Sequence, residues 1–213
     1  MRVFNKLEKY GWHAAGAVVA LMLVGFQTNQ SKIGVVDVGK VFRDSQLAHK
    51  EGESYQAVQE NRRSIIEFIN TYRVVTAEQA TRFRELSLKD APTPAEKQEL
   101  DKLKAAIIAN DKKFRDLQLK PSPNESEVKA LRDDNDLVQA CSLTLSKWAK
   151  EFDDELNALN DKYKKETLDR VKTAIKTYGA KKSFTLIFSS EVVPYGANEV
   201  TPDVLKTMDS LKP

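Results

Sequence analysis

The sequence has no glycine between Glu53 and Tyr178. Average usage, about 7%, would put roughly nine glycines in a stretch of that length. Its prolines come as two pairs, Pro92 with Pro94 and Pro121 with Pro123. Apolar residues recur at spacings of three and four, with charged residues between them. This pattern excludes a sheet or a compact mixed fold, and it predicts a few long amphipathic helices broken at defined corners.

Cysteine and histidine are also scarce. Cys141 is the only cysteine, so no intrachain disulfide can form. We expect it to pack as a small buried apolar residue, with an interchain disulfide as the alternative. His13 lies in the N-terminal segment, and the lone His49 is expected to be solvated or capping near a helix start. Without a nucleophile elbow, metal-ligand spacing or phosphate-binding glycine loop, the sequence predicts no enzyme, no cofactor and no metal site.

The net charge is small. It is +3 in total, and residues 1–30 account for +2, because Arg2, Lys6 and Lys9 stand against Glu8. The rest of the chain therefore carries only +1, which gives no basic field to attract nucleic acid. We expect no nucleic-acid partner.

Residues 1–30 form a separate segment. A basic start is followed by an uncharged apolar run from Ala14 to Phe26, which is the pattern of a secretory signal. The run is shorter than the roughly 20 residues that span a bilayer, although residues 10–13 extend it towards the lower limit. The sequence predicts export. It leaves open a cleaved signal peptide or an N-terminal membrane anchor, with membrane contact through residues 10–26.

Corners in the glycine-free stretch carry helix-start signals. Thr76–Gln79 forms a capping box, Thr93–Glu96 forms another with Pro94 at the first helical position, and Ser122–Glu125 repeats that design. Gly179 is a natural helix stop. Four helices are therefore predicted, at residues 45–74, 76–89, 94–119 and 123–178, with Asp44 or Ser45 capping the first.

Heptad spacing places apolar residues on one seam of the longer helices, with Arg62 in a slot that an apolar residue would fill. The last helix, of about 56 residues, would be roughly 84 Å long and needs an antiparallel partner. We expect a hairpin with its tip at 120–124 and the 76–89 segment folded aside. The main seam residues are Tyr55, Val58, Ile65, Ile69, Tyr72, Leu100, Leu103, Ile107, Phe114, Leu117, Leu145, Trp148, Phe152, Leu156, Leu159 and Tyr163.

The two ends of the chain contain the expected strands. Residues 32–38 are rich in β-branched residues, and residues 183–190 alternate apolar and polar side chains. A second short strand or a turn is expected at 191–195, and Thr201 is expected to cap a final helix. Because the ends supply so few residues, their exposed strand edges predict self-association.

The same ends carry a recognisable pattern. Residues 32–42 read Lys-Ile-Gly-Val-Val-Asp-Val-Gly-Lys-Val-Phe, and the C-terminal block joins Phe184–Phe188, Val192–Tyr195 and Asn198–Lys206. They resemble the opening strand and the closing strand, tyrosine and helix start of the Skp/OmpH family of periplasmic chaperones. Glu199 and Val200 stand where that family usually has Asp and Ile.

The resemblance implies a mainly α fold with a small β body that trimerises. Residues 31–44 and 180–213 would form the body, and residues 45–179 a helical hairpin arm. Three arms would enclose a periplasmic cavity that holds unfolded outer-membrane proteins without ATP. The residues expected in the oligomerisation body are Ile33, Val35, Val36, Val38, Phe184, Leu186, Phe188, Tyr195, Val204 and Leu205.

Apolar residues off the seam are candidate client contacts: Ile66, Val75, Phe83, Ile108 and Leu119. The alternative is that they pack against neighbouring helices in a thickened arm. Two features depart from the family, whose best-known members are strongly basic and lack the extra helices at 76–119. The competing function is a membrane-anchored periplasmic coiled-coil spacer or adaptor without chaperone activity.

Overall fold

The computed structural model describes residues 31–196 and 198–211. The described chain divides into two compact units. The body unit comprises residues 31–42 and 170–211, and the arm unit comprises residues 43–169. The predicted signal peptide or anchor, with its membrane contact at 10–26, lies outside the described residues. Within the described ranges, no helix combines the length and apolar character needed to cross a bilayer.

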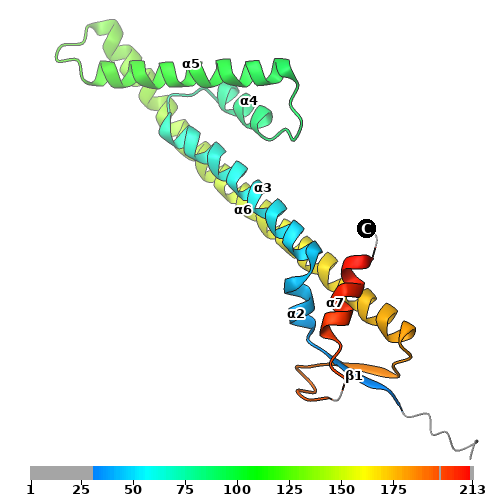
Figure 1. The fold of residues 1–213 in the computed structure, drawn as a ribbon. Coiled ribbons are helices and arrows are strands. Elements are labelled where there is room, and N and C mark those ends of the chain that lie inside the picture. The colour runs from blue at the N-terminus through cyan, green and yellow to red at the C-terminus, as the bar shows by residue number, and fades with distance from the viewer. Residues whose placement is uncertain (1–30, 197, 212–213) are drawn as a thin grey trace, which may run out of the picture. The chain divides into compact units, whose positions relative to one another are not determined.

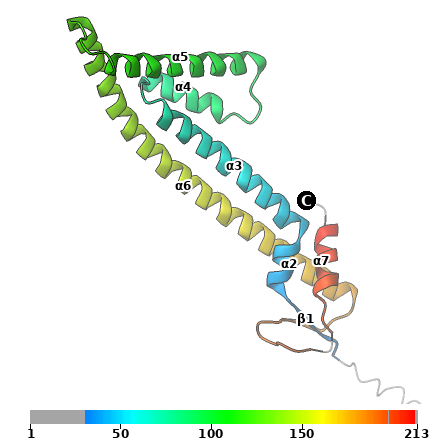
Figure 2. The same ribbon diagram turned by 60° about the vertical axis from the view of Figure 1, so that its left-hand side comes forward.

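The arm unit is built from long helices (Figure 1). They are α3 (Gln46–Thr71), α4 (Ala77–Ser87), α5 (Pro94–Gln118) and α6 (Glu125–Lys181), whose last turns belong to the body unit. The prediction of a helical hairpin with extra helices is confirmed. Figure 2 shows α4 lying between α3 and α5.

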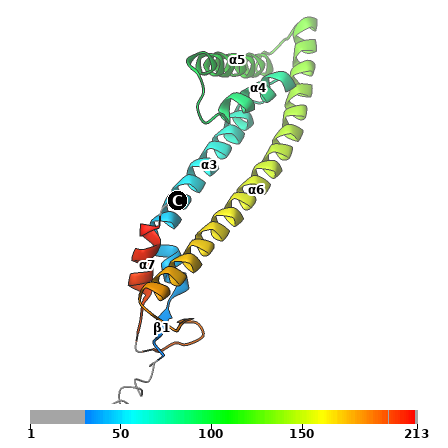
Figure 3. The same ribbon diagram turned by 90° about the vertical axis from the view of Figure 1, so that its right-hand side faces the viewer.

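Helices α3 and α6 run antiparallel, side by side (Figure 3). Side-chain contacts join Glu51 to Thr167 near one end of the pair, and Cys141 to the backbone of Ile69 near the other. Residue numbers on α3 therefore rise as those on α6 fall. The chain turns from α5 into α6 between residues 119 and 124, where Lys120 pairs with Glu127 at 2.6 Å.

The predicted seams converge in one core. Each fully buried Val, Leu, Ile or Phe side chain contributes about 1.5–3 kcal/mol, so this cluster is the main source of stability in the arm unit. Helix α4 adds to it because Phe83 stacks on Phe68, with ring centroids 4.8 Å apart. The buried members are Ile65, Ile69, Val75, Ala80, Phe83, Ile107, Cys141, Trp148 and Phe152.

Two of the three predicted capping boxes are confirmed. Thr76 and Gln79 cap α4 reciprocally, and Thr93 and Glu96 do the same for α5. The third predicted box, at Ser122–Glu125, is replaced by a cap at the next helix start. Asn124 caps α6, because its Oδ1 accepts from the backbone N–H of Glu127 (3.0 Å) and its own N–H donates to the Glu127 carboxylate (2.9 Å). Asparagine is as good an N-cap as serine, and it lies directly before the first helical residue.

The end of α6 also differs from the prediction. The helix continues through Gly179 to Lys181. The left-handed position is taken by Ser183, with φ 56°. The N–H of Phe184 then donates to the carbonyl of Gly179 (2.9 Å), and the N–H of Ser183 donates to that of Ala180 (3.3 Å), which is a Schellman motif. Glycine serves packing instead, since a Cβ at position 179 would lie 3.3 Å from Ile187 Cδ1.

The two chain ends form one small sheet in the body unit, as predicted. Strands β1 (Ile33–Val36) and β2 (Leu186–Ser189) are parallel, with Ile33 opposite Leu186. On the other side of β1, the N–H of Val35 donates to the carbonyl of Asn198, and the N–H of Val200 donates to that of Val35, both at 2.8 Å. Strand β1 is therefore central, and β2 has a free outer edge as far as the described residues show. Residues 190–192 form a turn, and residues 191–195 contain no second strand.

Two boundaries in the body unit were predicted wrongly. The strand ends at Val36, and Val38 begins the short helix α2 (Val38–Asp44), because the Asp37 carboxylate accepts from the N–H of Lys40 at 2.7 Å and caps that helix. Helix α7 (Thr201–Ser210) has Val200 at its N-cap with no side-chain cap bond. The Thr201 hydroxyl accepts instead from the N–H of Asp37 (2.8 Å), tying α7 to the end of β1.

Candidate functional site

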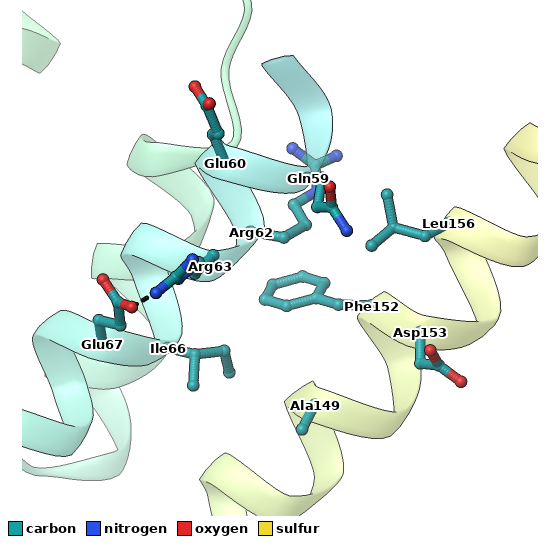
Figure 4. A pocket seen from close by; sticks show the side chains of 10 residues that line it. All are labelled: Gln59, Glu60, Arg62, Arg63, Ile66, Glu67, Ala149, Phe152, Asp153 and Leu156. Atoms are coloured by element: carbon teal, nitrogen blue, oxygen red, sulfur yellow. Dashed lines mark hydrogen bonds and ion pairs between the residues drawn. The ribbon is translucent and has the colours of Figure 1, made fainter. Parts of the chain in front are cut away.

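A groove of about 590 Å³ opens between α3 and α6 in the arm unit (Figure 4). We call it the arm groove. Its lining comes from these two helices alone. The lining residues are Gln59, Glu60, Arg62, Arg63, Ile66 and Glu67 from α3, and Ala149, Phe152, Asp153 and Leu156 from α6.

The floor of the arm groove is apolar. Ile66 and Phe152 point towards one another across the gap (Figure 4). Phe152 is buried, whereas Ile66 is only half-buried, although its neighbour Ile65 is fully covered by the core. Ala149 lies on the α6 side with no side chain beyond Cβ to fill the space. Because Ile66 and Ala149 remain accessible above the buried Phe152 ring, the arm groove can accept apolar groups of another molecule.

Arg62, the polar residue in the heptad seam, lines the arm groove part-way along α3, between Gln59 and Glu67. Its guanidinium pairs with Glu155 of α6 through Nη2 to Oε1 (2.6 Å) and Nε to Oε2 (3.2 Å). It also lies over the Phe152 ring, 5.8 Å from the centroid. The hydrogen bonds from Arg62 lower the pKa of Glu155, with smaller contributions from the charges of Arg62 and Arg84. Arg62 therefore joins α3 to α6 through an ion pair at a seam position where an apolar residue would be expected.

The charges on the two rims are not balanced. Arg62 is paired with Glu155, and Arg63 is paired with Glu67 at 2.6 Å. Glu60 on the α3 rim and Asp153 on the α6 rim are exposed, and neither forms an ion pair within the described part of the chain. Each rim of the arm groove therefore presents one exposed carboxylate outside an ion pair, Glu60 on α3 and Asp153 on α6.

The structure separates the candidate client contacts into two groups. Val75 and Phe83 are 3% and 2% exposed, in the core of the arm unit, where the packing alternative would place them. Ile66 lines the arm groove. Ile108 on α5 and Leu119 at its end are exposed, outside the arm groove. Client contact by any of them stays a prediction.

The residues expected in the oligomerisation body lie together in the body unit. Val35, Val36 and Val204 are buried within the single chain. Four more, Val38, Phe184, Phe188 and Leu205, are half-buried. The remaining three are exposed, by 42%, 51% and 88% respectively: Ile33, Leu186 and Tyr195.

Two of these exposed residues, Ile33 and Leu186, share a location. Ile33 and Leu186 are register partners, so their side chains lie on the same sheet face. The opposite face packs on α6 through Ile187. The outer edge of β2 and the Ile33–Leu186 end of this face are therefore open to a further molecule, whereas Val35 on the same face is buried beside Gly196.

The arm groove itself was not predicted from the sequence. A signal for it exists in the combination of Arg62 in the seam with Ala149 on the facing helix. It could be used only once the pairing of α3 with α6 was known, because Ala149 lies off the heptad positions. Among the described residues, no group of His, Cys, Asp and Glu side chains is arranged to hold a metal ion.

Comparison with known proteins identifies a family. A family model described as outer membrane protein (OmpH-like) matches residues 32–208. The matched span runs from the residue before β1 into α7 and includes every helix of the arm unit. None of the curated proteins compared with the chain matches it significantly.

Proposed function

Because the chain belongs to the OmpH-like outer membrane protein family, a family of chaperones for outer-membrane proteins, we propose that it is an ATP-independent holdase of the periplasm. In this proposal it binds unfolded outer-membrane proteins in a cavity between the helical arms of a homotrimer. The observation that carries the proposal is the match over residues 32–208, which spans both strands and the whole hairpin. Export through the segment at residues 1–30 belongs to the same proposal.

The described structure supports trimerisation through the open part of the body unit. Ile33 and Leu186 are a pair of apolar side chains that the single chain leaves exposed, next to the free edge of β2. A second copy can cover that face and continue the sheet, which removes both the apolar exposure and the unpaired backbone groups.

The arm unit supports holding rather than catalysis. Its buried apolar residues form a narrow core. Apolar carbon atoms remain accessible at Ile108, at Leu119 and in the arm groove. Weak contacts distributed in this way suit clients of different sequence, because no single pocket has to be filled. Such a chaperone needs no ATP. A client is released when it can bury its apolar surface more favourably elsewhere.

The direct test is aggregation of an outer-membrane protein on dilution from urea, followed as turbidity with no nucleotide present. A holdase suppresses turbidity at about three chains per client, the ratio expected for one trimer. Turbidity that is unchanged at this ratio would contradict the proposal, and would favour the coiled-coil spacer or adaptor instead.

A further inference from the structure

We propose that the arm groove binds an extended client segment in which apolar and polar side chains alternate and the polar side chains include lysine or arginine. This inference rests on the proposed function, and it adds a place on the arm unit and a chemistry for the bound segment. Three properties of the arm groove carry it: the partly accessible apolar floor, the short length and the exposed carboxylate on each rim.

The floor selects apolar side chains. Ile66 and Phe152 present carbon atoms from opposite helices, and Ala149 leaves room between them. The neighbouring Ile65 and Ile69 are 1% and 0% exposed, so the seam beneath is already filled. A side chain that enters the arm groove therefore gains burial without displacing any part of the core.

The length selects an extended segment. From Gln59 to Glu67 the α3 side advances eight residues, which at 1.5 Å each is about 12 Å. An extended chain rises about 3.3 Å per residue, so roughly four residues fit, and side chains at alternate positions point the same way. Two apolar side chains separated by one polar residue would then reach the floor. Strands of outer-membrane barrels have this alternation over about ten residues.

The rims select a basic residue. Glu60 and Asp153 are exposed residues that line the arm groove on its two sides, and neither has an ion-pair partner among the described residues, while the cations beside them are already paired. A lysine or arginine of the bound segment, next to the apolar pair, meets a carboxylate on either rim. A second copy offering the same surface would instead bring like charges together, which disfavours self-association here.

The test uses the full chain and two fluorescent peptides of about ten residues. Both alternate valine and tyrosine with a polar residue, which is lysine in one peptide and glutamate in the other. The lysine peptide is expected to bind about 2- to 30-fold more tightly, the effect of two exposed ion pairs of ordinary strength. Equal binding of the two peptides, or tighter binding of the glutamate peptide, overturns the inference.

Two variants locate the binding. Ala149→Trp fills the arm groove from an exposed position and should weaken both peptides several-fold. The matched control is Leu143→Trp, on the same helix but outside the arm groove and 77% exposed, which should leave both affinities unchanged. Reversing the rims with Glu60→Lys and Asp153→Lys together should invert the peptide preference, and this variant decides the question if Ala149→Trp does not fold. Identical binding by all variants overturns the inference.

The turbidity assay separates this inference from the proposed function. If the unchanged chain and Ala149→Trp suppress client aggregation equally, and peptide binding is also equal, the arm groove is not the site and the holdase function stands. If the unchanged chain does not suppress aggregation, the proposed function fails and the inference falls with it.

Discussion

Arg62 of α3 and Glu155 of α6 form a two-point ion pair across the seam of the arm unit, with the Arg62 guanidinium also over the Phe152 ring. The Arg62 side chain is 17% exposed and that of Glu155 is 44% exposed. The pair is thus partly in solvent, and Arg62 lines the arm groove. Its main effect is on the register and spacing of the two helices, since ion pairs at such exposure add little to stability.

The first prediction concerns this pair. Arg62→Met, which keeps most of the apolar stem, and Glu155→Gln should each lower the free energy of unfolding by about 0.2–1 kcal/mol. A double-mutant cycle in urea at neutral pH should give a coupling energy of the same size. Because the pair lowers the pKa of Glu155, the coupling is present above the ordinary value of 4.5 and is lost as the pH falls through the lowered one. No coupling at neutral pH would contradict the ion pair.

A second prediction concerns the buried hydrogen bond from the Thr167 hydroxyl to the Glu51 carboxylate. Thr167 is 0% exposed and Glu51 is 9% exposed. Thr167→Val removes the donor and leaves a buried acceptor unsatisfied, which should cost about 1–3 kcal/mol in thermal or urea unfolding.

Replacing both partners, as Glu51→Leu with Thr167→Val, should recover most of that loss, since neither polar group then remains buried. Ser146→Ala is the matched control, because that exposed hydroxyl donates only within its own helix, to the Ser142 carbonyl. A Thr167→Val loss no larger than that of the control would show that the buried bond does not stabilise the arm unit.

The third prediction concerns assembly. Ile33→Asp and Leu186→Asp each place a charge at the exposed end of the sheet in the body unit, and each should convert the proposed trimer to monomers in sedimentation velocity. Both positions are exposed in the single chain, so the circular dichroism spectrum should not change. The control is Leu143→Asp, at an exposed apolar position of the arm unit, which should remain trimeric. Trimers that survive both body substitutions would place the interface elsewhere.

The fourth prediction concerns the start of α5. The Lys89 ammonium, followed by the backbone N–H of Thr93, lowers the pKa of Glu96 to about 2. The carboxylate therefore stabilises the capping box at pH values above 4.5, and this contribution is lost as the pH falls towards about 2.

Hydrogen exchange of residues 93–100, normalised to the intrinsic rate at each pH, measures the fraying. Protection should fall over that pH window in the unchanged chain. In Glu96→Gln, which keeps an acceptor but does not titrate, protection should be lower at neutral pH and independent of pH. A pH dependence that persists in Glu96→Gln would assign the effect to another group.

The seams and the first two internal corners could be predicted because their signals are local. Thr76 and Thr93 each precede a partner three residues later, and the geometry of a helix start does not depend on the rest of the fold. The end of α6 could not be predicted in this way. Gly179 has the residue type of a helix stop, but it is needed inside the helix for the close approach of Ile187. Tertiary packing thus overrides the local preference, and Ser183 takes the left-handed position.

The candidate site was less predictable than the fold. Ile66, Val75 and Phe83 all lie off the heptad seam, and periodicity does not distinguish them. In the structure they differ in burial, and the difference depends on the side of the hairpin that α4 covers. Val75 and Phe83 are buried where α4 and the segment before it pack, whereas Ile66 lines the arm groove. The side on which α4 packs is set by tertiary contacts such as the Phe68–Phe83 stack.

Complex formation with a client tests the central claim most directly. An outer-membrane protein is diluted from urea into the full chain without nucleotide, and the mixture is analysed by size-exclusion chromatography with light scattering. The predicted result is one soluble species with the mass of three chains and one client. The result that would contradict the account is client aggregate in the void volume, with the chain eluting at the mass that it has alone.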